Sequence, residues 1–266
     1  MRFPLPLFAV LVAGCFQQPA GKVIYASAPA VKPDDWRVLV IGQSNAGSHA
    51  ERRTQTVTGR VYAEYLGYTQ PYADPIRGTT TWEWGEGSIW GLVGDALVMA
   101  GKAGTVTFTN ISRGGSTVEC WSRADWTAAT KYWGEEQPCY DLIPEAFAGG
   151  RQYTHIVWMQ GESDAGSGEA DYKGKLLNVI RDVRQYSNAP FYVGVTSLCG
   201  DDFGQGDGVR AAQVGIVGEY PELNLRRGAD TDLAAPLADR MFHADRCHLS
   251  WSGQQKAAQA WFGVLQ

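Results

Sequence analysis

The chain has 266 residues and a formal net charge of −5, with 44% hydrophobic and 19% charged residues. This balance supplies a sizeable core and argues against a disordered chain. The acidic character argues against binding to nucleic acid, which requires a basic surface. The length fits one α/β domain or a small two-domain protein, and without an internal repeat or a break in composition we expect a single domain and a monomer.

The N-terminal segment predicts export. A short apolar run, too short to span a bilayer as a mature helix, leads into small residues directly before Cys15, as in a secretory signal. This ending resembles the bacterial lipobox, in which the cysteine is lipidated and becomes the new N-terminus. We therefore expect a lipoprotein-type signal peptide at 1–14, a tether at 15–33 and a folded domain at 34–266. The protein would sit in the bacterial cell envelope and reach the membrane only through its lipid; the alternative is secretion.

From residue 36 onward, strand-like runs alternate with helix-like segments. The strand-like runs cover 37–42, 104–112, 155–160, 190–198 and, more weakly, 223–230. Apolar residues recur at helical spacing in 88–104, 172–187, 209–220 and 250–266. The alternation predicts a three-layer α/β/α sandwich around a five-stranded parallel sheet. The aromatic stretches 52–87 and 119–144 are predicted to be loop insertions above the sheet.

Polar clusters follow four of these strands. The first strand runs into "GQSN" at 42–45, the second into "SRGGST" at 112–117 and the third into "QGESD" at 160–164. The fifth is followed by "DRMFHADRCHLSWSG" at 239–253. Because ligands bind at the carboxyl ends of parallel strands, we expect the four clusters to meet at one edge of the sheet.

A serine in such a turn becomes a nucleophile only when a base takes its proton, and the base is usually a histidine oriented by a carboxylate. The chain has four histidines: His49, His155, His243 and His248. His155 begins a strand and so lies at the opposite edge, and His49 is expected on the surface of a first helix. The three-residue spacing of Asp245 and His248 on a turn puts carboxylate and imidazole on the same side, so that one loop could supply both.

The four clusters, in this order, resemble the SGNH hydrolase superfamily. The motifs "GQSN" and "QGESD" are most similar to carbohydrate esterases of the sialate O-acetylesterase and acetylxylan esterase type. The resemblance runs from residue 37 to the C-terminus and implies the flavodoxin-like fold of that superfamily, without a cofactor. It also implies that Ser44 is the nucleophile, His248 the general base and Asp245 the residue that orients it.

The same resemblance implies an oxyanion hole formed by the backbone N–H groups of Ser44 and Gly115. A third donor in the wider superfamily is an Asn in a Gly-x-Asn-Asp block, but this chain reads "GESD" at 161–164. We expect the side-chain amide of Gln160 to donate instead, with Ser163 as the alternative. Glu162 and Asp164 are expected to brace the loop.

Two other classes of function remain as alternatives. His243, Asp245 and His248 could hold a metal, although no HxH or HExxH motif supplies a further ligand. A surface-anchored sugar-binding protein with an inactive triad could use tryptophans in a cleft; the candidates are Trp82, Trp84, Trp90, Trp121, Trp126 and Trp133. The turn at Ser44 is not the GxSxG elbow of other hydrolases. We predict an exported serine esterase, free of metal, that removes O-acetyl groups from a polysaccharide or glycan; xylan, sialic acid and peptidoglycan stay open.

The four cysteines beyond the signal segment predict two disulfides, because an exported protein meets an oxidising compartment. None has the CxxC spacing of a zinc site. Cys120 and Cys139 flank one predicted insertion, while Cys199 ends a strand at the same edge as the loop of Cys247. The expected pairs are Cys120–Cys139 and Cys199–Cys247, against the alternative of buried free thiols.

Overall fold

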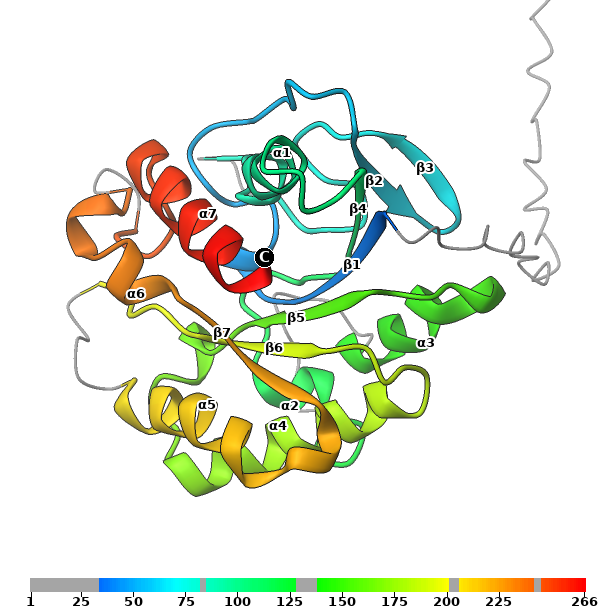
Figure 1. Ribbon diagram of the computed structural model, residues 1–266. Helices are drawn as coiled ribbons and strands as arrows, with labels where there is room; N and C mark the ends of the chain where they lie inside the picture. The colour runs from blue at the N-terminus through cyan, green and yellow to red at the C-terminus, as the bar shows by residue number, and fades with distance from the viewer. Residues whose placement is uncertain (1–33, 82–84, 128–137, 201–205, 242–244) are drawn as a thin grey trace, which may run out of the picture.

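The computed structural model describes residues 34–81, 85–127, 138–200, 206–241 and 245–266. In these ranges a seven-stranded sheet lies between two layers of helices (Figure 1). The predicted three-layer α/β/α class is therefore confirmed. The expected signal peptide, the tether and Cys15 lie outside the described residues.

The five predicted strands lie next to one another in the sheet and run parallel. They are β1 (Asp35–Gly42), β4 (Thr105–Asn110), β5 (His155–Met159), β6 (Phe191–Val195) and β7 (Leu225–Asp230), in the spatial order β4-β1-β5-β6-β7. Numbered among themselves, this is the flavodoxin-like order 2-1-3-4-5. Residues 38–41 of β1 are fully buried, because helices cover both faces of a parallel sheet and leave no polar side to the strand.

The strand count of five was wrong, because part of the predicted 52–87 insertion joins the sheet. Strand β2 (Val61–Tyr65) pairs parallel with β4, and β3 (Tyr68–Pro71) pairs antiparallel with β2. Leu66 and Gly67 connect them with positive φ angles of 49° and 88°, the backbone that a two-residue hairpin turn requires. The buried Glu64 interrupts the apolar pattern of β2. It forms an ion pair with Arg37 of β1, which is separated from β2 by β4.

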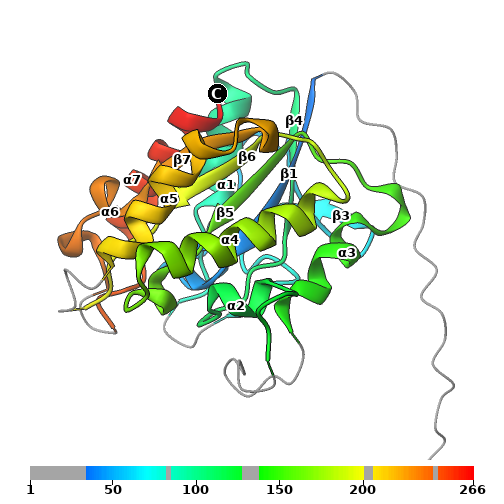
Figure 2. The same ribbon diagram turned by 90° about the horizontal axis from the view of Figure 1, so that it is seen from below.

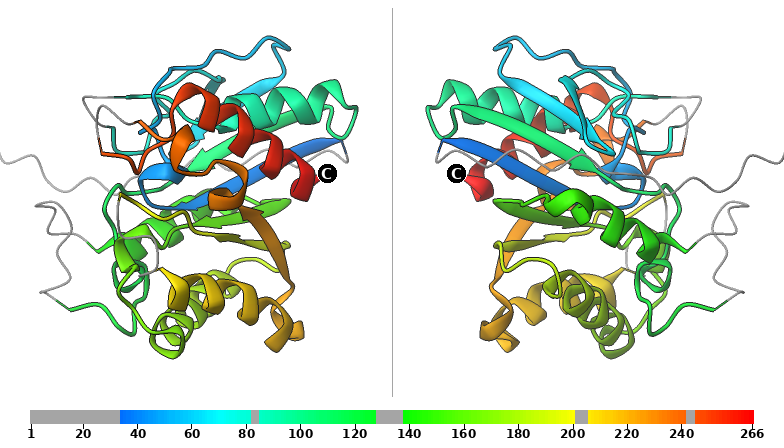
Figure 3. Two further views of the ribbon diagram at one scale, coloured as in Figure 1. Left: turned by 90° about the vertical axis from the view of Figure 1, so that its left-hand side faces the viewer. Right: turned by 90° about the vertical axis from the view of Figure 1, so that its right-hand side faces the viewer.

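The helices divide between the two faces of the sheet. Helices α1 (Trp90–Met99) and α7 (Trp251–Leu265) pack together on one face. On the other face lie α4 (Glu169–Arg184) and α5 (Asp207–Glu219), with the short α2 (Val118–Trp121) and α3 (Leu142–Phe147) (Figures 2 and 3). A separate apolar core fills each side of the sheet. All four predicted helices are present, each shifted or shortened by a few residues, and a single turn, α6 (Thr231–Ala234), follows β7.

Both predicted disulfides are present. Cys120 of α2 is bonded to Cys139, just before α3, and Cys199 is bonded to Cys247. The pairs agree with the predicted export, because structural disulfides persist in oxidising compartments. None of the helices within the described ranges has the length and apolar character needed to cross a membrane.

Candidate active site

The proposed nucleophile lies on a tight turn at the carboxyl end of β1. Residues Ser44–Ala46 form a single 3-10 turn directly after the strand. At Gly42 a Cβ atom would lie 2.0 Å from the carbonyl oxygen of Met159, so no other residue fits between β1 and β5. The chain leads from β1 to β4 on one side of β1, whereas β5 on the other side leads away to β6. Open α/β sheets form a binding crevice where the strand order reverses in this way.

Two buried side chains hold this turn from below. The carbonyl oxygen of Ala46 accepts hydrogen bonds from the Trp90 indole nitrogen and the Asn110 amide, both at 2.7 Å. Trp90 was a candidate for a sugar cleft, but it is fully buried and supports the nucleophile turn instead. The sequence pattern did not reveal this, because the tryptophan lies 44 residues from its partner.

The remaining tryptophans do not form the suggested cleft as far as the structure describes them. Trp121 is fully buried and donates to the Ser116 hydroxyl at 2.9 Å. Trp126 packs edge-on against Tyr140. The other three candidates, Trp82, Trp84 and Trp133, lie outside the described residues.

The loop before α7 brings together Asp245 and His248. The Asp245 Oδ2 atom lies 2.5 Å from His248 Nδ1, and Oδ1 accepts the backbone N–H groups of Cys247 and His248 at 2.9 and 3.0 Å. Burial alone would raise the pKa of Asp245, but the imidazole hydrogen bond and charge and these two N–H donors lower it to about 2. The carboxylate is thus ionised and aimed at the imidazole.

A disulfide and an amide connect this loop to the rest of the site. The bond from Cys247 to Cys199 attaches the residue before His248 to the segment after β6. The Asn45 amide, next to the nucleophile, donates to Glu162 Oε1 at 2.8 Å, to Ser197 Oγ at 3.3 Å and to the Cys247 carbonyl at 3.5 Å. The nucleophile turn and the histidine loop are therefore held to common partners.

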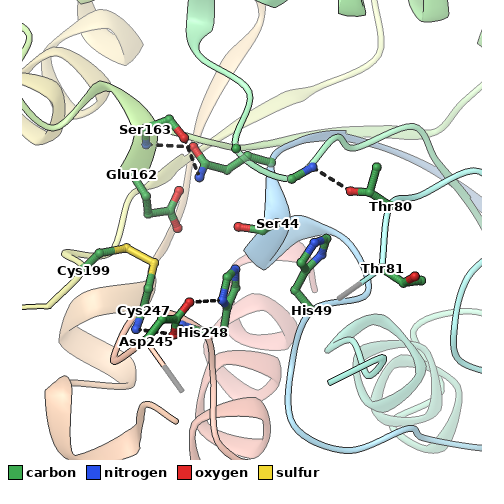
Figure 4. A pocket seen from close by; sticks show the side chains of 13 residues that line it. Ser44, His49, Thr80, Thr81, Glu162, Ser163, Cys199, Asp245, Cys247 and His248 are labelled. Carbon is green, nitrogen blue, oxygen red and sulfur yellow. Dashed lines mark hydrogen bonds and ion pairs between the residues drawn. A yellow bond between two sulfur atoms is a disulfide. The ribbon is translucent and has the colours of Figure 1, made fainter. Parts of the chain in front are cut away.

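These segments enclose a cavity of about 560 Å³. Its lining comes from all four polar clusters, from the 52–87 region and from two further residues, His49 and Cys199. The lining residues are Gln43, Ser44, His49, Thr80, Thr81, Gly114, Gly115, Glu162, Ser163, Cys199, Asp245, Cys247 and His248. In Figure 4 the hydroxyl of Ser44 and the imidazole of His248 face each other across this cavity, with Asp245 behind the imidazole. The four clusters meet at one edge of the sheet, as the sequence indicates.

Two backbone N–H groups at this cavity are uncommitted. In the described part of the chain, neither Ser44 N–H nor Gly115 N–H donates to another group. The adjacent Gly114 N–H is already used by the Thr80 hydroxyl, at 2.7 Å. Gly115 has a φ of +68°, a backbone region that glycine adopts without strain. Two free donors beside a serine can bind the oxyanion of a tetrahedral intermediate.

The structure contradicts the expected donor role of Gln160. Its amide nitrogen already donates to Gln43 Oε1, Ser116 O and Asp164 Oδ2, and the residue is 1% exposed and does not reach the cavity. Gln43 lines the cavity instead. Gln43 Oε1 accepts from Gln160 Nε2 and from the N–H groups of Gly161 and Ser163. These three donors fix which way the Gln43 amide points.

Glu162 and Asp164 brace the loop, as expected. Besides the Asn45 amide, Glu162 Oε1 accepts the Ser197 hydroxyl at 2.9 Å. Asp164 Oδ2 accepts Val118 N–H at 2.9 Å and the Gln160 amide. Burial raises the pKa of Asp164 to about 6, although these hydrogen bonds oppose the rise.

His49 was wrongly expected on the surface. It is 6% exposed, lines the cavity and stacks on His248, with ring centroids 5.3 Å apart. His155 is at the opposite edge, as predicted, where it stacks on Trp36. His243 lies outside the described residues.

The metal alternative gains no support from the geometry. The one group of potential metal ligands among the described residues is Asp245, Cys247 and His248. The sulfur of Cys247 is consumed by its disulfide, so it cannot bind as a thiolate. Asp245 and His248 are engaged with each other through the Nδ1 atom.

The fold is that of an SGNH-type hydrolase. The chain belongs to the family described as carbohydrate esterase, sialic acid-specific acetylesterase, whose model matches residues 77–260. The match begins after the nucleophile turn and includes the other three polar clusters. The protein is therefore a carbohydrate esterase. No curated protein matches the sequence.

Similar solved structures agree on the fold. A protein from Arabidopsis thaliana aligns with a TM-score of 0.62 at 15% identity, covering 87% of this chain and 99% of its own. NanS aligns with a TM-score of 0.54 at 17% identity, covering 89% and 98%. A variant of Axe2, an acetyl xylan esterase from Geobacillus stearothermophilus, aligns with a TM-score of 0.50 at 13% identity, covering 91% and 98%.

Proposed function

We propose that the protein removes O-acetyl groups from a carbohydrate by way of a Ser44–His248–Asp245 triad. One observation carries the proposal: Ser44 and the Asp245-bound His248 line the same cavity, beside two uncommitted backbone N–H groups. A sugar-binding protein would have no need for such donors at a serine. Membership of a carbohydrate acetylesterase family supports the same conclusion.

The residues would act in the usual order of a serine esterase. His248 takes the proton of the Ser44 hydroxyl as its oxygen attacks the acetyl carbonyl carbon, and Asp245 stabilises the imidazolium that forms. The N–H groups of Ser44 and Gly115 bind the oxyanion. His248 then gives its proton to the departing sugar hydroxyl, and the acetyl group stays on Ser44. Water, deprotonated by His248, attacks this ester, and His248 returns the proton to the Ser44 oxygen as acetate leaves.

We further propose that Gln43 supplies the third oxyanion donor. Among the described residues its Nε2 atom donates to one group, Ser163 Oγ at 3.3 Å, while its Oε1 atom is held by three donors. The second N–H of the amide is therefore available at the cavity. Ser163 accepts a hydrogen bond from this amide, so the effect of Ser163→Ala is to be compared with that of Gln43→Ala.

The cavity favours a neutral sugar over an anionic one. Among the described residues that line it, Glu162 and Asp245 carry a formal charge and none is Lys or Arg. Arg240 lies beneath the histidine loop, where it donates to the Cys247 carbonyl at 3.0 Å, and it is 3% exposed. A carboxylate on the sugar would thus meet negative charge without a cation to pair with. Acetylated xylo-oligosaccharide should be a better substrate than acetylated sialic acid.

Acetate release from acetylated glycans by the purified protein tests the function. The wild type should release acetate, and Ser44→Ala should lower kcat by about 10⁴-fold or more while retaining its fold by circular dichroism. Asp245→Asn should keep KM and lose kcat, because the imidazole loses its orienting charge. Activity near that of the wild type in Ser44→Ala would overturn the assignment of the nucleophile.

A further inference from the structure

A second histidine, which the triad does not use, lies against the proposed base. His49 follows the nucleophile turn by three residues, and its ring plane is tilted by only 22° from that of His248, at 5.3 Å between centroids. In Figure 4 the imidazole of His248 lies below Ser44, and that of His49 lies to the right of both. The second ring therefore forms an offset stack with the first one, where the base must keep its orientation.

The backbone around His49 is fixed from both sides. Ser48 forms a bridge with Thr81, and Ala50 exchanges two backbone hydrogen bonds with Gly87 at 2.8 and 2.9 Å. The ring itself is confined by the oxyanion loop, since a Cβ atom on Gly114 would lie 2.7 Å from His49 Nε2. His49 is thus clamped between His248 and Gly114.

The charge state of His49 also suits a place beside the base. Burial, together with the charge of His248, lowers the pKa of His49 to about 3, against an opposing influence from Asp245. Among the described residues, these two are the charged groups that act on His49. The ring is therefore neutral at neutral pH. A neutral neighbour does not oppose the positive charge that His248 acquires while Ser44 is attacking.

His49 cannot replace His248 as the base. Its Nδ1 atom is buried and has no hydrogen-bond partner in the described part of the chain. It therefore lacks the carboxylate that orients a catalytic imidazole and stabilises its charged form. Its contact with the machinery is the stack on His248.

We propose that His49 is a positioning residue for this esterase: its ring packs on His248 and holds the imidazole in the orientation that serves Asp245 and Ser44 together. The proposal rests on the proposed function, since it assigns His248 as the base. A displaced base is costly, because misplacing a reacting group by about 1 Å can lower a rate by about 10²-fold.

Two replacements separate stacking from polarity. His49→Phe keeps a flat ring and removes both nitrogens, whereas His49→Asn keeps a polar amide and removes the ring. We expect His49→Asn to lower kcat by at least about tenfold with KM within about twofold, and His49→Phe to stay within about threefold of the wild type. His155→Asn is the matched control, because it removes a histidine stacked on Trp36 far from the cavity, and its kcat should equal that of the wild type.

Two outcomes would overturn the proposal: a fully active Asn variant, or a Phe variant as slow as the Asn variant. In either case the stacked ring would not be what the reaction requires of His49. Proton NMR gives a readout that does not need activity. The hydrogen-bonded proton between His248 Nδ1 and Asp245 should persist in His49→Phe and broaden or vanish in His49→Asn. Its persistence in both variants would refute positioning even if no glycan were deacetylated, whereas an active Ser44→Ala variant would refute the proposed function alone.

Discussion

Replacing Asp164 by Asn should remove a pH dependence from the stability of the protein. Asp164 is 8% exposed, and burial raises its pKa from 3.8 to about 6 in the folded state. The folded protein therefore binds this proton more tightly than the unfolded chain does. The contribution to stability is complete below about pH 4 and is lost as the pH rises through about 6.

The size of the effect follows from the shift. About two pKa units correspond to about 3 kcal/mol, at about 1.4 kcal/mol per unit. Between about pH 4 and about pH 7.5, the free energy of unfolding of the wild type should therefore fall by about 3 kcal/mol relative to that of Asp164→Asn. The asparagine oxygen can accept the same two hydrogen bonds, from Val118 and Gln160, without a charge.

Urea unfolding followed by tryptophan fluorescence, at several pH values with the disulfides intact, measures this difference. Glu222→Gln is the control, because it removes one carboxyl group from an exposed position. Other carboxyl groups titrate alike in variant and wild type and cancel in the comparison. A stability difference for Asp164→Asn that stays constant within about 0.5 kcal/mol over this pH range would refute the burial argument.

Three further predictions concern the site and its attachment. Gln43→Ala should lower kcat by about 10²-fold with little change in KM, as expected for an oxyanion donor, and more than Ser163→Ala does; a change in KM alone would assign Gln43 to substrate binding. Removing the Cys199–Cys247 disulfide by a double serine replacement should lower kcat and cost up to about 4 kcal/mol of stability. A double serine replacement of Cys120 and Cys139 should leave kcat near the wild-type value. Equal losses of kcat in the two double variants would show that the Cys199–Cys247 bond has no specific part in catalysis. Cys15→Ser should move the protein from the membrane fraction to the soluble fraction in a bacterial host, and a mature wild type without lipid mass at its N-terminus would contradict the lipobox.

Local patterns were sufficient for the elements that form from neighbouring residues. The apolar run of β1, the helical spacing of α4 and α7, and the three-residue gap between Asp245 and His248 all depend on short-range geometry. The α/β alternation then predicts a parallel sheet, since each helical crossover returns the chain so that the strands run in one direction and their carboxyl ends meet at one edge. In this way the class of fold and the meeting of the four clusters could be predicted.

Elements that depend on distant partners were missed. Strand β2 contains a buried Glu64, which is compatible with a sheet because Arg37, 27 residues earlier, pairs with it. His49 is buried because Gly87 and Gly114 hold its segment and its ring against the histidine loop. No periodicity in the sequence around these residues carries that information.

The sequence by itself determined which chemical groups stand at the end of each strand: a serine after β1, glycines after β4, an amide and two carboxyl groups after β5, and an acid with a histidine before α7. The tertiary structure decided which of them reach the cavity. Gln43 and Gln160 carry the same amide, yet Gln160 is turned toward Ser116 and Asp164 while Gln43 lines the cavity. The direction of a polar side chain is set by the hydrogen-bond partners that surround it. Apart from Asp164, the partners here come from segments more than 40 residues away, which only the folded chain brings together.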